Sequence, residues 1–304
     1  MSNPHFEIRP LPHGEYLKFL ICARRKREDT QERYFYEWGN IHVSLMLTTP
    51  AVLQVFKRYI QHYAISGVTD DMLLYPLSAM EWDNMADHWL VSNEDLLISL
   101  TDIGYVQRMQ PHSFGDKNFN LALCTGEVVF QKAGFRSGGG VKLTHWFKKR
   151  PELSIEAFNR HWRDRYAPVF LETAGGAGLV RKYVQNRQLE LDRVMFKGTL
   201  FEHGGVGEFA GVEEIWFDSL ESLARLKRDA SLRGPLETAL AEFVDPEGSF
   251  SMVTTERVVF DYATPGELSP PPAIRDPGSL ETQVVAQGYR DWNLPKPVMD
   301  TPVG

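Results

Sequence analysis

The sequence has too few cysteines for two common kinds of stabilised or metal-binding protein. Only Cys22 and Cys124 occur among its 304 residues. A disulfide framework or a cysteine-rich zinc site needs more thiols than these, and no grouping of cysteine and histidine has zinc-ligand spacing. We therefore expect a protein of the reducing cytoplasm without a dedicated metal site.

Long apolar stretches and an excess of basic residues are also missing. No window approaches the roughly 18 consecutive apolar residues of a membrane span, and residues 1–16 show no basic start followed by an apolar run. We expect neither secretion nor insertion into a membrane. The formal net charge of -7 and the isoelectric point near 5.8 argue against a general binder of nucleic-acid phosphates.

What the chain does contain is an internal repeat. Six residues recur 124 positions later as the same or a similar residue, in the pairs Lys18 and Lys142, Thr30 and Ser154, Glu32 and Glu156, Trp38 and Trp162, Tyr59 and Tyr183, and Gln61 and Gln185. The offset grows to 127 at Trp89 and Trp216 and to 130 at Phe130 and Phe260. Small loop insertions in a diverged tandem duplication explain such a drift.

Each half is predicted to run strand, helix, strand, strand, helix, strand. Short apolar runs of strand length open the halves at 16–23 and 141–147. Four hydroxyl residues are expected to cap the helices, namely Thr30, Ser92, Ser154 and Ser219. The remaining strands are expected at 58–63, 80–90 and up to Phe130, and in the second half at 181–186, 209–217 and up to Phe260.

A unit of this order forms a four-stranded antiparallel sheet with both helices on one face. Two units can bury their bare faces against each other. We predict an α+β fold in which two tandem ferredoxin-like βαββαβ repeats pack sheet to sheet as an intramolecular dimeric α/β barrel. The expected divisions are 1–135 for the first repeat, 136–140 for a Gly-rich linker, 141–262 for the second repeat and 263–304 for a Pro-rich extended tail. The tail and antiparallel edge pairing would both allow a homodimer.

The first helix of the second half carries a family resemblance. The stretch KKRPELSIEAFNRHWRDRYAPVF (148–170), followed by KYVQN, FAGVEEIWF and EFVD, resembles the EthD family of the dimeric α/β-barrel superfamily. The family pattern on this helix has serine, phenylalanine, tryptophan and then His-Gly/Ala-Pro. The second half keeps Ala167-Pro168 but has Tyr166 in place of the histidine, whereas the first half keeps a histidine, His42, without the proline. The resemblance is specific in the second half and weaker in the first.

The resemblance implies chemistry on aromatic compounds without fixing the reaction. Relatives of this kind include cofactor-independent dehydratases, cyclases and decarboxylases of phenolic or polyketide-like molecules, and the wider superfamily has quinone-forming monooxygenases and haem enzymes. We expect a lyase of aromatic catabolism that needs no cofactor and works by histidine acid/base catalysis in an apolar pocket. The alternatives are a monooxygenase or haem-dependent enzyme, or a non-catalytic carrier of a flat aromatic ligand.

Four residues are the catalytic candidates, since histidine exchanges protons near neutral pH. His42 falls on the apolar face of the first helix, so we expect it in a cavity between helices and sheet, or as a core histidine bonded to a backbone carbonyl. His112 or Tyr59 would return a proton. His62 lies on the face of its strand opposite to Tyr59, so it can share the cavity only if a bulge intervenes.

Six further residues are candidates for binding the substrate. Lys18 or Arg24, at the first strand, would hold a substrate carboxylate. Tyr166 and Tyr183 would line a polar pocket in the second half, with a satisfied core tyrosine as the alternative for Tyr166. The two remaining candidates are Trp38, on the face of His42, and His145, which faces either a cavity or the barrel core.

Overall fold

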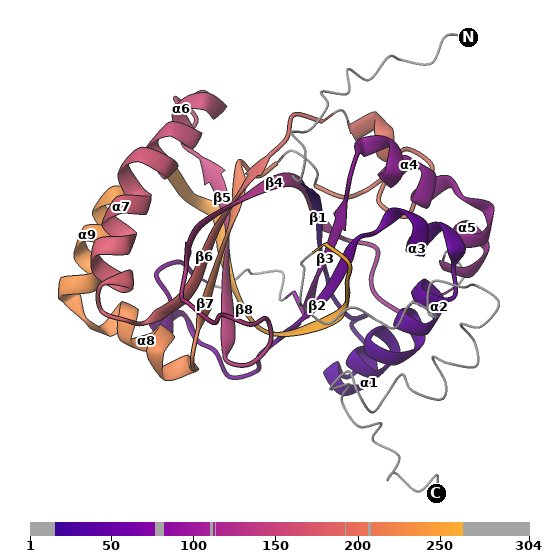
Figure 1. Ribbon diagram of the computed structural model, residues 1–304, viewed down its shortest axis with the longest axis horizontal. Helices are drawn as coiled ribbons and strands as arrows, with labels where there is room; N and C mark the ends of the chain where they lie inside the picture. Colours follow the sequence, from indigo (N-terminus) through magenta and orange to yellow (C-terminus); the bar gives the residue numbers. More distant parts are fainter. Residues whose placement is uncertain are drawn as a thin grey trace, which may run out of the picture.

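A closed eight-stranded barrel forms the centre of the protein (Figure 1). The computed structural model describes residues 16–76, 82–109, 112, 114–191, 193–205 and 208–263. In these residues the strands follow one another around the barrel in the order β1-β3-β2-β8-β5-β7-β6-β4, and every pair is antiparallel. Helices cover the barrel on two opposite sides. The predicted α+β class and the predicted closure into a barrel are confirmed.

Strands β1 to β4 form the first half of the barrel and β5 to β8 the second. Their bounds are Leu17–Ala23 (β1), Arg58–Ala64 (β2), Asn84–Leu90 (β3), Asn120–Gln131 (β4), Val141–Lys149 (β5), Val180–Gln188 (β6), Gly211–Phe217 (β7) and Val244–Asp261 (β8). Each half has the order fourth, first, third, second. The halves also join edge to edge, because β2 pairs with β8 and β4 pairs with β6. This pairing removes the free strand edges that two separate sheets would expose.

The helices begin where capping residues predict. Those of the first half are α1 Gln31–Tyr36, η1 Glu37–His42, α2 Val43–Leu47, α3 Pro50–Val55, α4 Asn93–Thr101 and α5 Ile103–Met109. Those of the second are α6 Ile155–His161, η3 Trp162–Tyr166, α7 Ala167–Phe170, η4 Leu171–Gly175, α8 Leu220–Arg228 and α9 Ala230–Ala241. Short 3-10 turns lie at η2 Asp70–Met72 and η5 Arg193–Phe196. The side chains of Thr30, Ser92, Ser154 and Ser219 each accept the backbone N–H three residues on, as expected.

The second helix of each half is shorter than its sequence pattern suggests, because an aspartate divides it. Asp102 separates α4 from α5, and its Oδ1 accepts the backbone N–H of Tyr105 at 2.9 Å. Asp229 separates α8 from α9 and accepts the N–H of Ser231 at 3.0 Å. A carboxylate that satisfies free N–H groups starts a new helix instead of continuing the old one.

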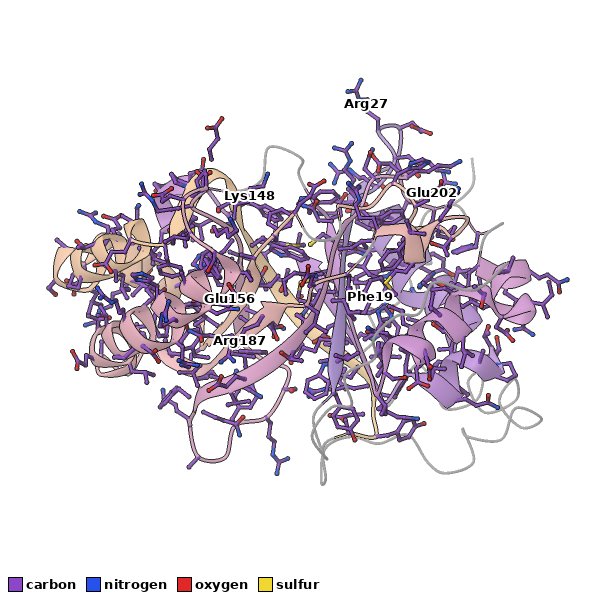
Figure 2. The ribbon with its side chains drawn as sticks, turned by 90° about the horizontal axis from the view of Figure 1, so that it is seen from above. Phe19, Arg27, Lys148, Glu156, Arg187 and Glu202 are labelled. Atoms are coloured by element: carbon purple, nitrogen blue, oxygen red, sulfur yellow. The ribbon has the colours of Figure 1, made fainter. Side chains whose placement is uncertain are left out.

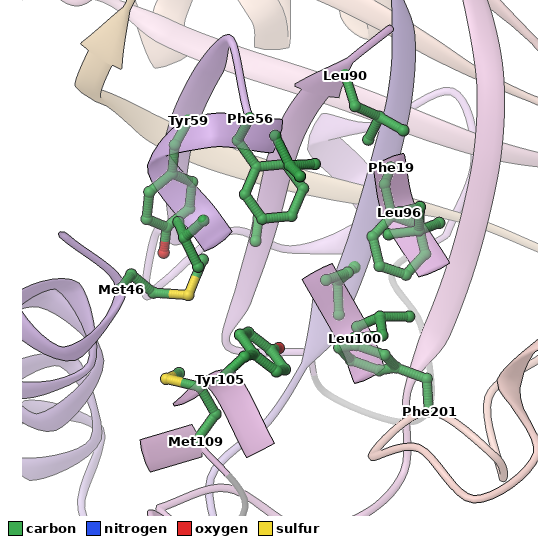
Figure 3. Close-up of a cluster of buried hydrophobic side chains, with 14 of the residues drawn as sticks. Phe19, Met46, Phe56, Tyr59, Leu90, Leu96, Leu100, Tyr105, Met109 and Phe201 are labelled. Atoms are coloured by element: carbon green, nitrogen blue, oxygen red, sulfur yellow. The ribbon is translucent and has the colours of Figure 1, made fainter. Parts of the chain in front are cut away.

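Two apolar layers separate the barrel from its helices. Figure 3 shows the layer of the first half, where Phe19 of β1, Tyr105 of α5 and Phe201 contribute rings. An equivalent layer in the second half contains Phe147, Phe158 and Phe243. The inside of the barrel has a third apolar cluster around Trp146, and charged side chains fill the rest of it. We therefore expect any site for a small molecule between the helices and the sheet or within the charged interior of the barrel.

The structure describes the predicted linker but not the predicted tail. The Gly-rich linker is described, and Gly138, Gly139 and Gly140 have φ of 81°, 74° and 70°, a region that favours glycine. The predicted Pro-rich tail at 263–304 lies outside the described residues apart from Ala263. Within the described residues, no helix is both long enough and apolar enough to cross a lipid bilayer.

Candidate functional site

A cavity of about 460 Å³ lies between the helices and the sheet of the first half, where the sequence predicts one. Its walls are mainly apolar and aromatic, with Phe19, Trp38, Phe56, Phe114, Phe119 and Phe201 among the lining residues. The segment 199–203, which follows β6, supplies part of the wall from the second half. Figure 2 shows Glu202 of this segment on the same side of the molecule as Phe19. The cavity is therefore complete only when both halves are present.

His42 reaches the cavity from the end of a widened helical turn. The π-helical turn η1 places the backbone carbonyl of Trp38 toward β2, where Gln61 Nε2 donates to it at 3.1 Å. Gly39 allows this close approach, since a Cβ there would lie 2.5 Å from Tyr63 Oη. The second half repeats the arrangement, with Gln185 Nε2 donating to the carbonyl of Trp162 at 3.0 Å. This shared contact explains two of the residue pairs at offset 124, and π-turns are frequent at functional sites.

Three neutral histidines line the cavity. The ring centroids of His42 and His112 lie 6.2 Å apart, and both rings contact Phe114. Burial, with smaller effects from His112 and His88, lowers the pKa of His42 to about 3, and burial lowers the pKa of His88 to about 4. Burial also lowers the pKa of His112, against the opposing effect of Glu37. All three rings are therefore neutral at pH 7, and burial makes their protonated forms less favourable than that of an ordinary histidine.

His42 is the histidine best placed to act as a base. Its Nδ1 is buried and has no hydrogen-bond partner among the described residues, a property that ring nitrogens of His88 and His112 share, and its ring lies beside that of His112 in the cavity wall. The alternative of a core histidine whose ring nitrogen is fixed by a backbone carbonyl does not apply to this atom. The Nε2 of His112 lies 3.9 Å from Glu37 Oε2, so a protonated His112 would be stabilised by a carboxylate.

The strand β2 separates two of the predicted catalytic residues. Tyr59 faces the helices, where its ring stacks on His88 at 4.6 Å and its hydroxyl accepts from Gln61 at 3.0 Å. Burial raises the pKa of Tyr59. His62 points into the barrel, with its Nε2 3.3 Å from Lys142 Nζ. A bulge lies between Tyr59 and Ile60 in the pairing with β8, but the side chains of β2 still alternate between its two faces. The prediction that His62 shares one site with His42 is therefore wrong.

The two cations expected to hold a substrate carboxylate are held by carboxylates of the protein. Lys18 points into the barrel, where its Nζ lies 2.7 Å from Glu214 Oε2. Arg24 Nε donates to Asp116 Oδ2 at 2.6 Å, and Asp116 lines the cavity. Lys18 is therefore outside the cavity, and Arg24 positions an acidic side chain at its edge.

The predicted binding residues of the second half lie in a closed layer. Tyr166, Tyr183 and His145 are fully buried. His145 Nδ1 lies 2.8 Å from Glu213 Oε2, and the hydroxyl of Tyr166 lies 3.5 Å from the same oxygen. Tyr75, from the first half, packs edge-on against His145 at 5.3 Å between ring centroids. The core reading of Tyr166 is therefore the correct one, and His145 faces the helix layer with a carboxylate partner.

Residues that the sequence did not predict reach the cavity from the other half. Phe201, Glu202 and His203 line the cavity from the segment between β6 and β7. One signal for this segment is present in the sequence, because the repeat offset grows from 124 at Gln61 to 127 at Trp89. Three extra residues lie in this connection of the second half.

One group of potential metal ligands lies inside the barrel. Ligand atoms of His62, Asp87 and Glu214 lie within 4.8 Å of one another in the described residues. Lys18 and Lys142 both form ion pairs with Glu214, so their ammonium groups already occupy the position that a cation would take. A metal ion would have to displace them against their charge.

Acidification from pH 7 to pH 5 is expected to destabilise the fold. Burial holds the pKa of His42 and His62 at about 3 and that of His88 at about 4, whereas unfolded histidines bind a proton near pH 6.5. Stability is thus complete above pH 6.5 and falls as the pH approaches the folded values, by roughly 1–2 kcal/mol per residue at pH 5. Urea denaturation at both pH values measures the difference.

The variant His62→Gln tests the origin of this pH dependence. It removes one of the three titrating rings, so its loss of stability between pH 7 and pH 5 should be smaller than that of the wild type. The raised pKa of Asp87 works in the opposite direction, because that carboxyl gains stability as it is protonated. Equal losses of stability in the wild type and the variant would mean that folding does not lower the pKa of His62.

Residues 150–247 match the family model of the EthD domain. This part of the chain is similar to the EthD domain. The match runs from just before α6 to the start of β8, and it includes Tyr166 and the segment 199–203. The matched part of the chain thus contains the closed layer around Tyr166 and also supplies one wall of the cavity in the first half.

Two solved structures illustrate the wider likeness. An anthrone oxidase-like protein is 13% identical over 84% of this chain and 98% of its own, with a TM-score of 0.49. A mutant chlorite dismutase from Candidatus Nitrospira defluvii in complex with cyanide is 11% identical over 79% of this chain and 90% of its own, with a TM-score of 0.41. None of the curated proteins matches this sequence. At these identities neither structure indicates a reaction for this chain.

Proposed function

We propose that the protein is a cofactor-independent lyase that binds a flat aromatic or phenolic molecule in the cavity of the first half. The observation that carries this proposal is the neutral His42, with an unpartnered Nδ1, on the wall of an aromatic cavity. An apolar cavity of about 150 Å³ is large enough for benzene. A volume of about 460 Å³ therefore suits a molecule of up to about three rings.

His42 acts as the general base in this proposal. Its neutral imidazole accepts a proton from a phenol or an activated C–H bond, and the resulting imidazolium and the delocalised anion attract each other strongly because the walls exclude water. His112 takes up a proton beside Glu37 when the substrate binds and gives that proton to the leaving group. In a dehydration, the electron pair of the broken C–H bond forms the new double bond, and the hydroxyl departs with the proton of His112 as water.

The need for a cation separates the two lyase reactions. A decarboxylase needs a cation for the substrate carboxylate, and the ion pairs of Lys18 and Arg24 engage both predicted cations with protein carboxylates. Lys117 is a lysine that lines the cavity. A phenolic substrate without a carboxylate requires none of them.

The two halves are, in this proposal, diverged EthD-like ferredoxin-fold repeats with the boundaries predicted from the sequence. The equal strand order of the halves supports this, as do the contacts of Gln61 and Gln185 with equivalent carbonyls. The first repeat has kept an open site with His42. The second has closed its site around Tyr166, with Tyr75 as part of the cover.

The test combines a spectrum, a native mass and a compound screen on one purified sample. We expect a colourless protein, quenching of tryptophan fluorescence by phenols of up to three rings through Trp38, and substrate loss of water or carbon dioxide without oxygen consumption. A visible absorbance band or oxygen consumption would favour the haem or monooxygenase alternative. Binding with no change in ligand mass would favour a carrier. The native mass also reports whether the predicted homodimer forms.

A further inference from the structure

Lys182 differs from the other lysines that face the inside of the barrel. It lies on the same face of β6 as Asn186, whose Nδ2 donates to the interior carboxylate of Glu214 at 2.8 Å. Lys18 and Lys142 both form ion pairs with Glu214. In the part of the chain that the structure describes, the Nζ of Lys182 has neither a carboxylate within ion-pair distance nor a hydrogen-bond partner. Its amine is therefore held by contacts of another kind.

Two aromatic rings hold the amine of Lys182 in place. Its Nζ lies 4.9 Å from the ring centroid of Phe135 and 5.4 Å from that of Trp216. These two rings contact each other edge to face at 5.8 Å. An aromatic face attracts a cation but accepts no proton from it in a conventional hydrogen bond. Once the amine is neutral, its lone pair is therefore available for reaction.

The cover over Lys182 is built by the connection between β4 and β5. Arg181, the neighbour of Lys182, donates from Nη1 to the carbonyl of Gly139 at 2.7 Å and from Nη2 to that of Arg136 at 3.2 Å. These bonds fix the connection that carries Phe135. Lys182 remains partly exposed beneath it.

The charges around Lys182 favour the neutral amine. Burial, together with the positive charges of Lys18 and Arg58, lowers the pKa of Lys182 to about 8. The opposing effects of Glu214 and Glu256 are smaller. At pH 7.5 roughly a quarter of such an amine is neutral, against about a thousandth of an ordinary lysine. Neutral lysine amines in apolar surroundings act as nucleophiles.

We propose that Lys182 is a covalent-modification site for small acyl and carbonyl electrophiles at this end of the barrel. The lone pair of Nζ attacks the carbonyl carbon of an activated acyl donor, an amide bond forms, and the leaving group departs with the electron pair of its former bond. The nitrogen loses one proton to solvent. With an aldehyde the product is an imine and the oxygen leaves as water. Either neutral product removes a positive charge that Lys18 and Arg58 repel.

Limited acetylation of the intact protein tests this site. The protein is treated with a small amount of acetic anhydride between pH 7 and pH 10, and the labelled lysines are quantified by peptide mass spectrometry. Lys197, which is exposed, is the internal reference. We expect Lys182 to react about tenfold faster than Lys197 at pH 7.5 and to reach its plateau near pH 8 to 9, while Lys197 continues to gain reactivity. Equal rates at pH 7.5, or parallel pH profiles, would overturn the proposal.

Two variants separate the proposed cause from simple exposure. Lys182→Arg should remove the fast-reacting site and leave the labelling of Lys197 unchanged. Phe135→Ala opens the cover to water, so we expect the plateau of Lys182 to move to higher pH even though the amine becomes more accessible. A plateau that stays in place in this variant would show that the aromatic cover does not set the reactivity of Lys182.

Discussion

Replacing His42 with glutamine is expected to lower kcat by about 10²- to 10⁴-fold, the usual contribution of a positioned general base. Glutamine keeps a polar side chain of similar size but cannot take up a proton. Because His42 Nδ1 makes no hydrogen bond, its loss should cost the fold little, and the unfolding midpoint should stay within about 2–4 °C of the wild type. Turnover of the compound found in the screen and thermal unfolding measure the two effects.

The control for this prediction is His161→Gln. His161 lies at the end of α6 in the second half, 3.6 Å from Glu242, and it does not line the cavity. This variant should keep the activity of the wild type. Unchanged kcat in His42→Gln would exclude His42 as the base, and equal losses in both variants would point to a general effect on folding.

Much of the fold follows from local signals in the sequence. Capping hydroxyls such as Thr30 and Ser154 mark helix starts because they satisfy the free N–H groups of the first turn. The recurrence of Gln61 as Gln185 marks a shared need to bond a carbonyl of a π-turn. Such features depend on neighbours within one half, so a repeat in the sequence is enough to predict them.

The candidate site depends on contacts that no local pattern encodes. The segment 199–203 of the second half lines the cavity of the first half. In the other direction, Tyr75 of the first half packs on His145 of the second half. The role expected of Lys18 was wrong for the same reason, since its partner Glu214 is 196 positions away in the sequence. A strand pattern predicts which face of the strand a lysine occupies. It does not predict which carboxylate lies beside that lysine inside a closed barrel.

Replacing Glu214 with leucine is expected to destabilise the protein by about 3–5 kcal/mol, the cost of breaking a buried ion pair on one side. Glu214 is fully buried and receives Lys18 Nζ at 2.7 Å and Asn186 Nδ2 at 2.8 Å, besides its ion pair with Lys142. Without it, two ammonium groups remain inside the barrel with less negative charge to balance them. Urea denaturation at pH 7 gives the difference in the free energy of unfolding.

An exposed ion pair supplies the matched control. Glu127→Leu removes a carboxylate that pairs with Arg187 at the surface, so it should change stability by less than about 1 kcal/mol.

The attraction of Lys142 and Lys18 also holds the pKa of Glu214 well below 4.5. Its contribution is therefore complete above pH 4.5 and is lost only as the pH falls toward the folded value.

The triple variant Lys18→Met, Lys142→Met, Glu214→Leu decides whether the loss comes from unpaired charge or from lost packing. Removing all three charges together leaves no ammonium group without its shared carboxylate, and apolar replacements of buried ion pairs are often neutral or stabilising. Glu256, which also pairs with Lys142, keeps its hydrogen bonds from the backbone N–H of Gly138 and from Trp216 Nε1. We expect the triple variant to recover most of the stability that Glu214→Leu loses. If it is as unstable as the single variant, the interior network stabilises the barrel through its shape and hydrogen bonds, and the ion pairs are not the cause.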